Sequence, residues 1–91
     1  MIHVSVVLDK KGRIASGPQV RAIGMPGDEE YPLDEALDDL AEVAVDAMKK
    51  LDAEARDNDE LVETAISRAL KKASQRIWER RPIVETTVLR I

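Results

Sequence analysis

The first eight residues alternate between apolar and polar side chains, with apolar residues at Ile2, Val4, Val6 and Leu8. A period of two is typical of a strand that buries one face. Residues 9–12 then have the composition of a turn, and the last of them, Gly12, suits a positive φ. The chain is extended again over residues 13–15, so we expect a β-hairpin.

The second strand of this hairpin contains an interruption. Ser16-Gly17-Pro18 separates residues 13–15 from a run of mixed apolar and polar residues at 19–23. Proline has no N–H to donate and is tolerated mainly on edge strands or at bulges, so we predict that this strand forms an edge of the sheet. Residues 24–27 break regular structure, and an acidic segment beginning at Asp28 leads into a helix.

Two stretches with helical spacing follow. Apolar residues recur every three or four positions in the first, at Leu33, Leu37, Leu40, Ala44, Ala47, Met48 and Leu51. Residues 52–58 connect the stretches, and Asp57 followed by Glu60 is typical of a capping box that starts a helix. The apolar stripe of the second stretch comprises Val62, Ala65, Ile66, Ala69, Leu70, Ala73 and Ile77. We therefore predict two amphipathic helices.

The end of the chain is expected to be a strand. Pro82 disfavours helical geometry at Arg81, so the second helix should stop near Arg80 and residues 83–91 should be extended. Both faces of this strand carry apolar residues, with Ile83, Leu89 and Ile91 on one and Val84 and Val88 on the other. A strand with one solvated face would not need this pattern.

The resulting order of elements is β-β-α-α-β. It predicts an α+β fold in which two antiparallel helices cover one face of a three-stranded mixed sheet, as one domain over residues 1–91. We expect the sheet order 2-1-3, with the last strand parallel to the first. The other face would then be an exposed apolar surface of the kind that marks a partner contact. The candidate interface residues are His3, Ser5, Val7, Ile83, Glu85, Thr87, Leu89 and Ile91.

Composition narrows the possible chemistry. The chain of 91 residues has no cysteine and one histidine, which excludes a disulfide framework, a thiolate zinc site and a cysteine nucleophile. It contains no stretch near the ~20 apolar residues of a membrane span. The net charge of −4 conceals a strong segregation. Residues 28–60 hold fourteen acidic and three basic residues, whereas residues 61–91 hold three acidic and seven basic ones.

The sequence indicates no set of residues that could form a catalytic site. His3 has no acid at a metal-ligand spacing, and without a second histidine no serine has a basic partner of the usual kind. Asp38-Asp39 lie on a solvated helix face, where neighbouring side chains point apart. Residues 24–27 lack the lysine and hydroxyl of a phosphate-binding loop. Nothing therefore favours an independent small enzyme.

One basic cluster keeps a second interpretation open. It comprises Lys71, Lys72, Arg76, Arg80 and Arg81, and positions 72, 76 and 80 follow one helix face. Such a stripe can contact phosphates, which makes Lys72, Arg76, Arg80 and Arg81 candidate RNA contacts. The alternative is that cations collect in the last turns of a helix because they interact favourably with its dipole.

The order of these features resembles a known family. The runs Val4-Ser5-Val6-Val7-Leu8-Asp9-Lys10-Lys11-Gly12-Arg13-Ile14, Ser16-Gly17-Pro18-Gln19-Val20 and Arg80-Arg81-Pro82-Ile83-Val84 are similar to the C-terminal domain of ribonuclease J. The resemblance covers nearly the whole chain, through the hairpin, an acidic helix, a basic helix and the entry to the last strand. A longer segment at residues 25–31 departs from the family pattern.

The resemblance implies a place in a larger cytoplasmic enzyme. In this family a metallo-β-lactamase domain with an inserted β-CASP domain carries zinc and cleaves RNA as a 5′-to-3′ exonuclease and as an endonuclease. The C-terminal domain supports assembly into dimers or tetramers. None of the family's histidine-rich zinc motifs occurs here, so no catalytic or metal residue carries over and no cofactor is expected in this segment. The expected partners are a second copy, the parent's catalytic domains and, through the whole enzyme, RNA, with no membrane. The leading hypothesis is a non-catalytic oligomerisation and scaffolding domain, and the alternative is an accessory RNA-binding module.

Overall fold

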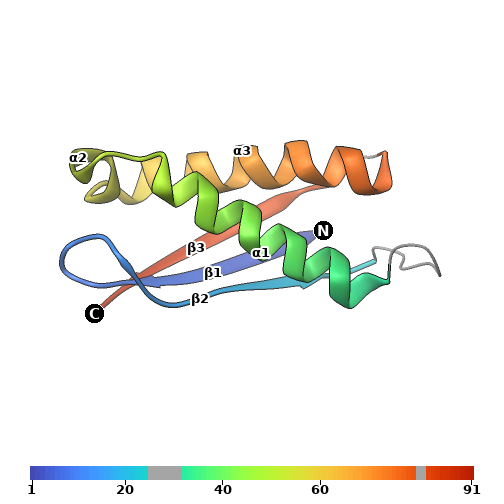
Figure 1. The fold of residues 1–91 in the computed structure, drawn as a ribbon, viewed down its shortest axis with the longest axis horizontal. Helices are drawn as coiled ribbons and strands as arrows, with labels where there is room; N and C mark the ends of the chain where they lie inside the picture. The colour runs from blue at the N-terminus through green and yellow to red at the C-terminus, as the bar shows by residue number, and fades with distance from the viewer. Residues whose placement is uncertain (25–31, 80–81) are drawn as a thin grey trace.

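The computed structural model describes residues 1–24, 32–79 and 82–91. Its elements are β1 (Ile2–Leu8), β2 (Ile14–Ala22), α1 (Leu33–Lys49), a short helix α2 (Ala53–Arg56), α3 (Asp59–Trp78) and β3 (Val84–Arg90). Figure 1 shows α1 and α3 side by side, covering the same side of the strands. The predicted order of two strands, two long helices and a strand is confirmed, with α2 added in the segment that was expected to be a connection.

The sheet has the predicted order β2-β1-β3. β1 is central, antiparallel to β2 and parallel to β3. The parallel arrangement is possible because α1 and α3 intervene between β1 and β3 and return the chain to the same end of the sheet. β2 and β3 are therefore the two edges.

The core lies between the sheet and the helices. β1 alternates as predicted, and every second residue of it is fully or almost fully buried. The main core residues are Ile2, Val4, Val6, Leu8, Leu40, Ala44, Met48, Val62, Ile66, Leu70, Ala73 and Val84. Since no phenylalanine is present, aliphatic packing provides nearly all of the apolar burial.

β2 differs from the prediction because it is continuous. It runs through Ser16, Gly17 and Pro18, where the Gly17–Pro18 peptide bond is cis and the pairing with β1 shifts register. A bulge inserts unpaired residues in one strand while pairing resumes on both sides, which explains why the strand does not end at the proline. The prediction that β2 is an edge strand is confirmed.

The start of α3 also differs from the expectation, whereas its end lies close to the predicted stop near Arg80. The residue that caps its start is Asn58, whose side-chain oxygen accepts hydrogen bonds from the backbone N–H groups of Glu60 and Leu61. Asp57 instead ends α2, because the extra helical turn occupies the residues before Asn58. At its other end α3 stops at Trp78, and Glu79 adopts the left-handed conformation with φ +56°.

Candidate interaction surface

The face of the sheet opposite the helices, called here the open face, brings together the side chains that β1 does not bury. Its character is set by strand alternation, because odd-numbered residues of β1 and β3 share this face. Three rows cross it from β2 through β1 to β3: Arg21–His3–Glu85, Gln19–Ser5–Thr87 and Ser16–Val7–Leu89. Over β1 and β2 these three rows are mainly polar, so the expected exposed apolar surface does not extend across them.

Exposed large apolar side chains occur along β3 and also at Met1 and Ile23, which pair with each other at the end of the sheet. Ile83 and Ile91, which flank this strand, are each 70% exposed, and Leu89 is 54% exposed. On the helix side of the same strand Val84 is buried and Val88 is half-buried. The prediction that β3 is apolar on both faces is thus confirmed.

His3 is held across the two strands that form the centre of this face. Its Nε2 lies 3.2 Å from Oγ1 of Thr87, a hydrogen-bond distance at which either group can donate. In the sheet register its neighbours are Arg21 and Glu85. This arrangement fixes the ring on the surface of the sheet, and it provides no second imidazole or nucleophile for acid–base chemistry.

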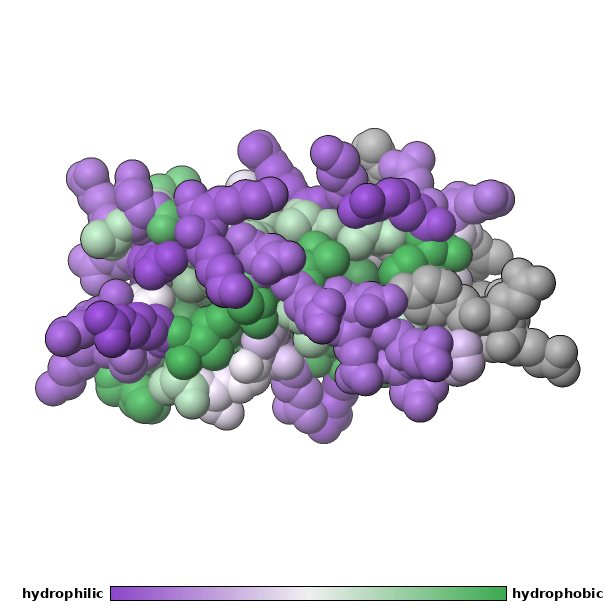
Figure 2. Space-filling model, in the orientation of Figure 1, coloured by the Kyte–Doolittle hydropathy of each residue, from purple (hydrophilic) through white to green (hydrophobic). Residues whose placement is uncertain are grey.

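The basic residues of α3 lie on the other side of the molecule. Lys72 and Arg76 are exposed and line, together with Asp46 of α1, a cavity of about 440 Å³ between the helices. Arg76 also lines a neighbouring cavity with Asp39. Figure 2 shows this surface as apolar atoms between two rows of hydrophilic ones. A phosphate here would meet carboxylates as well as cations.

The remaining two predicted RNA contacts, Arg80 and Arg81, lie outside the described residues. Antiparallel packing of α1 against α3 explains the segregated charge of the chain. It places the acidic face of one helix beside the basic face of the other, so each offsets the other's field locally.

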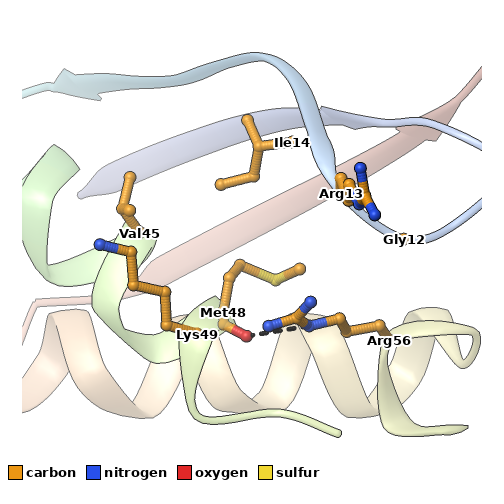
Figure 3. Close-up of a pocket in the computed structure, with 7 residues that line it drawn as sticks. All are labelled: Gly12, Arg13, Ile14, Val45, Met48, Lys49 and Arg56. Carbon is orange, nitrogen blue, oxygen red and sulfur yellow. Dashed lines mark hydrogen bonds between the residues drawn. The ribbon is translucent and has the colours of Figure 1, made fainter. Parts of the chain in front are cut away.

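A smaller pocket lies where the first hairpin meets the helices. It has a volume of about 260 Å³, and Figure 3 shows Ile14, Val45 and Met48 forming its apolar part. Arg13, Lys49 and Arg56 surround it, and Nε of Arg56 donates to the backbone oxygen of Met48 at 3.3 Å. Its lining contains no carboxylate, hydroxyl or imidazole, so it has no group able to act as a general base or a nucleophile at neutral pH.

Asp9 organises the turn beside this pocket. One oxygen of its carboxylate accepts the backbone N–H groups of Lys11 at 2.8 Å and of Arg13 at 2.9 Å. The hydrogen bond from Arg13, supported by the one from Lys11 and by the positive charges of both side chains, holds the pKa of Asp9 below its usual value of 3.8. The residue is half-buried in the turn, and its role is to stabilise the hairpin.

The part of the chain that the structure describes contains neither a cluster of metal-ligating side chains nor a membrane-spanning helix. Within residues 1–24, 32–79 and 82–91, no three His, Asp or Glu side chains come together in a way that could hold a metal ion. These residues therefore do not fit the zinc centre that the resemblance places in the parent enzyme. None of the described helices is long and apolar enough to cross a membrane.

Comparison with known proteins gives one negative result and one match. No curated protein matches the chain. A family model does match, over residues 1–91, and it describes the ribonuclease J C-terminal domain. Because the match spans the whole chain, this protein belongs to the ribonuclease J C-terminal domain family.

Proposed function

We propose that this chain is the non-catalytic, self-associating module of a ribonuclease J, which links copies of the enzyme. The observation that carries the proposal is the group of exposed apolar residues along β3, namely Ile83, Leu89 and Ile91. Exposed large apolar side chains that no element of the described residues covers are typical of protein–protein contact sites. The RNA cleavage and the zinc ions would belong to other domains of the parent.

The matched substitutions Leu89→Asp and Leu61→Asp test the proposal. Both leucines are about half exposed, at 54% and 49%, but Leu61 lies on α3, away from the open face. Burying the remaining half of a leucine contributes about 1 kcal/mol, and a symmetric contact contains two copies. Leu89→Asp should therefore weaken the association at least about 30-fold, because about 1.4 kcal/mol corresponds to a factor of ten in Kd.

The measurement is light scattering of the 91-residue chain over a range of concentrations reaching several hundred micromolar. We expect concentration-dependent self-association that Leu89→Asp shifts to at least about 30-fold higher concentration and that Leu61→Asp leaves unchanged. A strict monomer at every concentration would refute the proposal, as would equal effects of the two substitutions.

The alternative of an accessory RNA-binding module gives a different outcome. It predicts that the chain binds RNA with a steep dependence on salt, and that Lys72→Glu and Arg76→Glu weaken this binding. Asp46 and Asp39 beside these cations argue against it. RNA binding by a chain that remains monomeric would favour the alternative over self-association.

A further inference from the structure

The outer edge of β3 is a row of backbone groups beside which the described chain places no strand. The N–H of Ile2 donates to the oxygen of Ile83 at 2.8 Å, and the N–H of Ile91 donates to the oxygen of Leu8 at 3.0 Å. Hydrogen-bonding directions alternate along a strand, so odd-numbered residues of β3 face β1. The N–H and C=O groups that point outward are those of Val84, Thr86, Val88 and Arg90.

The two edges of the sheet differ in how well they are protected. β2 contains Pro18, which has no N–H, and its pairing with β1 is irregular next to Ser5 and Val7. Prolines and bulges are devices that keep an edge from pairing with another chain. β3 has neither proline nor glycine, and its register with β1 is regular over seven residues. Only the edge of β3 is suited to accept another strand.

We infer that β3 pairs antiparallel with β3 of a second copy of this chain, about a twofold axis at Thr86. The inference rests on the proposed self-association and names its contact. Val84 then lies opposite the partner's Val88, and exposed Ile83 lies opposite the partner's exposed Leu89. Arg90 lies opposite the partner's Pro82. Proline has no N–H, so no donor is left without an acceptor at this end of the paired strands. All four outward N–H groups of each strand gain an acceptor.

Charges on α3 are complementary about the same axis. Oγ of Ser67 lies 2.8 Å from Oγ1 of Thr86, so Ser67 is level with the axis. Glu63, Ser67 and Lys71 form one row at a spacing of four residues, on the side of α3 away from the residues that line the groove with α1. Since the partner helix runs antiparallel, Glu63 of one copy meets Lys71 of the other, twice in the dimer.

The small side chain of Ser67 also matters for how closely the two copies of α3 can approach each other. Adjacent strands are about 4.8 Å apart, whereas packed helices need about 8–10 Å. Two helices lying on neighbouring strands must therefore splay apart through the twist of the sheet and have a small residue where they come closest. Moving the axis by one residue along β3 would shift Glu63 away from the partner's Lys71, so the charges select the register at Thr86.

A charge swap tests the inference. Glu63→Lys and Lys71→Glu alone should each weaken dimerisation about tenfold, since each replaces two attractive pairs by two repulsive ones. The double variant should restore the affinity to within about twofold, because the pairs are re-formed with opposite polarity. Arg68→Glu is the matched control. It reverses one charge on an exposed position of the same helix outside this row, and it should leave dimerisation unchanged. Sedimentation equilibrium measures all four, and urea unfolding checks that each variant is folded.

Amide hydrogen exchange provides a second, independent readout. On raising the protein concentration, the amides of Val84, Thr86, Val88 and Arg90 should become protected, because they are hydrogen-bonded only in the edge-paired dimer. Dimers in which these amides exchange at a concentration-independent rate, or in which the double charge variant is no better than the single ones, would overturn the inference and leave self-association standing. A chain that never associates would overturn both.

Discussion

Replacing Gly12 by alanine tests how the first hairpin is joined to α2. Gly12 has φ +76°, and a Cβ added there would lie 2.7 Å from Cβ of Arg56 and 3.4 Å from its backbone oxygen. A left-handed conformation costs an L-residue about 1–2 kcal/mol. Forcing apart packed atoms costs typically about 1–3 kcal/mol more. The substitution should therefore lower the free energy of unfolding by about 2–5 kcal/mol, a large part of the stability of a small domain.

Gly24→Ala separates these two contributions. Gly24 has φ +72°, but a Cβ there would meet no atom of the described residues within 4 Å. Gly24→Ala should therefore lower the free energy of unfolding only by the cost of the left-handed conformation, about 1–2 kcal/mol. Urea unfolding at 25 °C, with the m-value unchanged between variants, measures both losses.

The difference between the two glycine variants isolates the contact with Arg56. We expect Gly12→Ala to be the more destabilising by at least about 1 kcal/mol, and the Arg56→Gly background to recover most of that difference in a double-mutant cycle. Equal losses at the two glycines would show that the hairpin moves away from α2 without cost, and the reasoning from the short contact would be refuted.

Three further changes follow from polar groups in the structure. Ser74→Ala should stabilise the chain by about 1 kcal/mol in urea unfolding, because the Ser74 hydroxyl is fully buried with no hydrogen-bond partner among the described residues and alanine favours helix. Asn58→Ala should destabilise it by about 1 kcal/mol through loss of the α3 cap, whereas Asp57→Ala should have little effect in the same assay. The folded-state pKa of Asp9 lies below 3.8, so its contribution to stability is present above that pH and is lost as the pH falls through the folded value. The stability advantage over Asp9→Asn should thus shrink below pH 3.8, as urea titrations at pH 2–6 would show.

The fold was predictable because each element has a strong and unambiguous period. The alternation over residues 2–8 and the apolar stripes of the two long helices include every residue of these elements in the main core. The match is not complete, because Leu33 and Leu37 of the first stripe are only half-buried, whereas Ala36 and Ser74 are buried outside the stripes. Element ends were less predictable, since they depend on local competition. Asp57 and Asn58 both have side chains that cap helices, and the additional turn at 53–56 decides between them.

The candidate surface was predictable in one strand only. Periodicity assigns Ile83, Leu89 and Ile91 to one face, and the structure confirms their exposure. The polar character of the neighbouring rows depends on pairing across strands, and register cannot be read from one strand's own sequence. The bond between Ser67 and Thr86 likewise joins residues from two elements whose relative height follows from packing, so no local signal indicated it.

The contrast between the two sheet edges bears on why β3 is built as it is. An unpaired regular strand and exposed large apolar residues are both features that soluble monomers avoid, because each promotes unwanted association. The proline and the irregular pairing at β2 show that this chain does protect an edge. Both unfavourable features coincide on β3, at Ile83, Leu89 and Ile91 and along the same outer edge. If this sheet simply lacked protection against pairing with other chains, both of its edges would be open. A contact that uses β3 instead requires that the edge of β2 is protected and the edge of β3 is not.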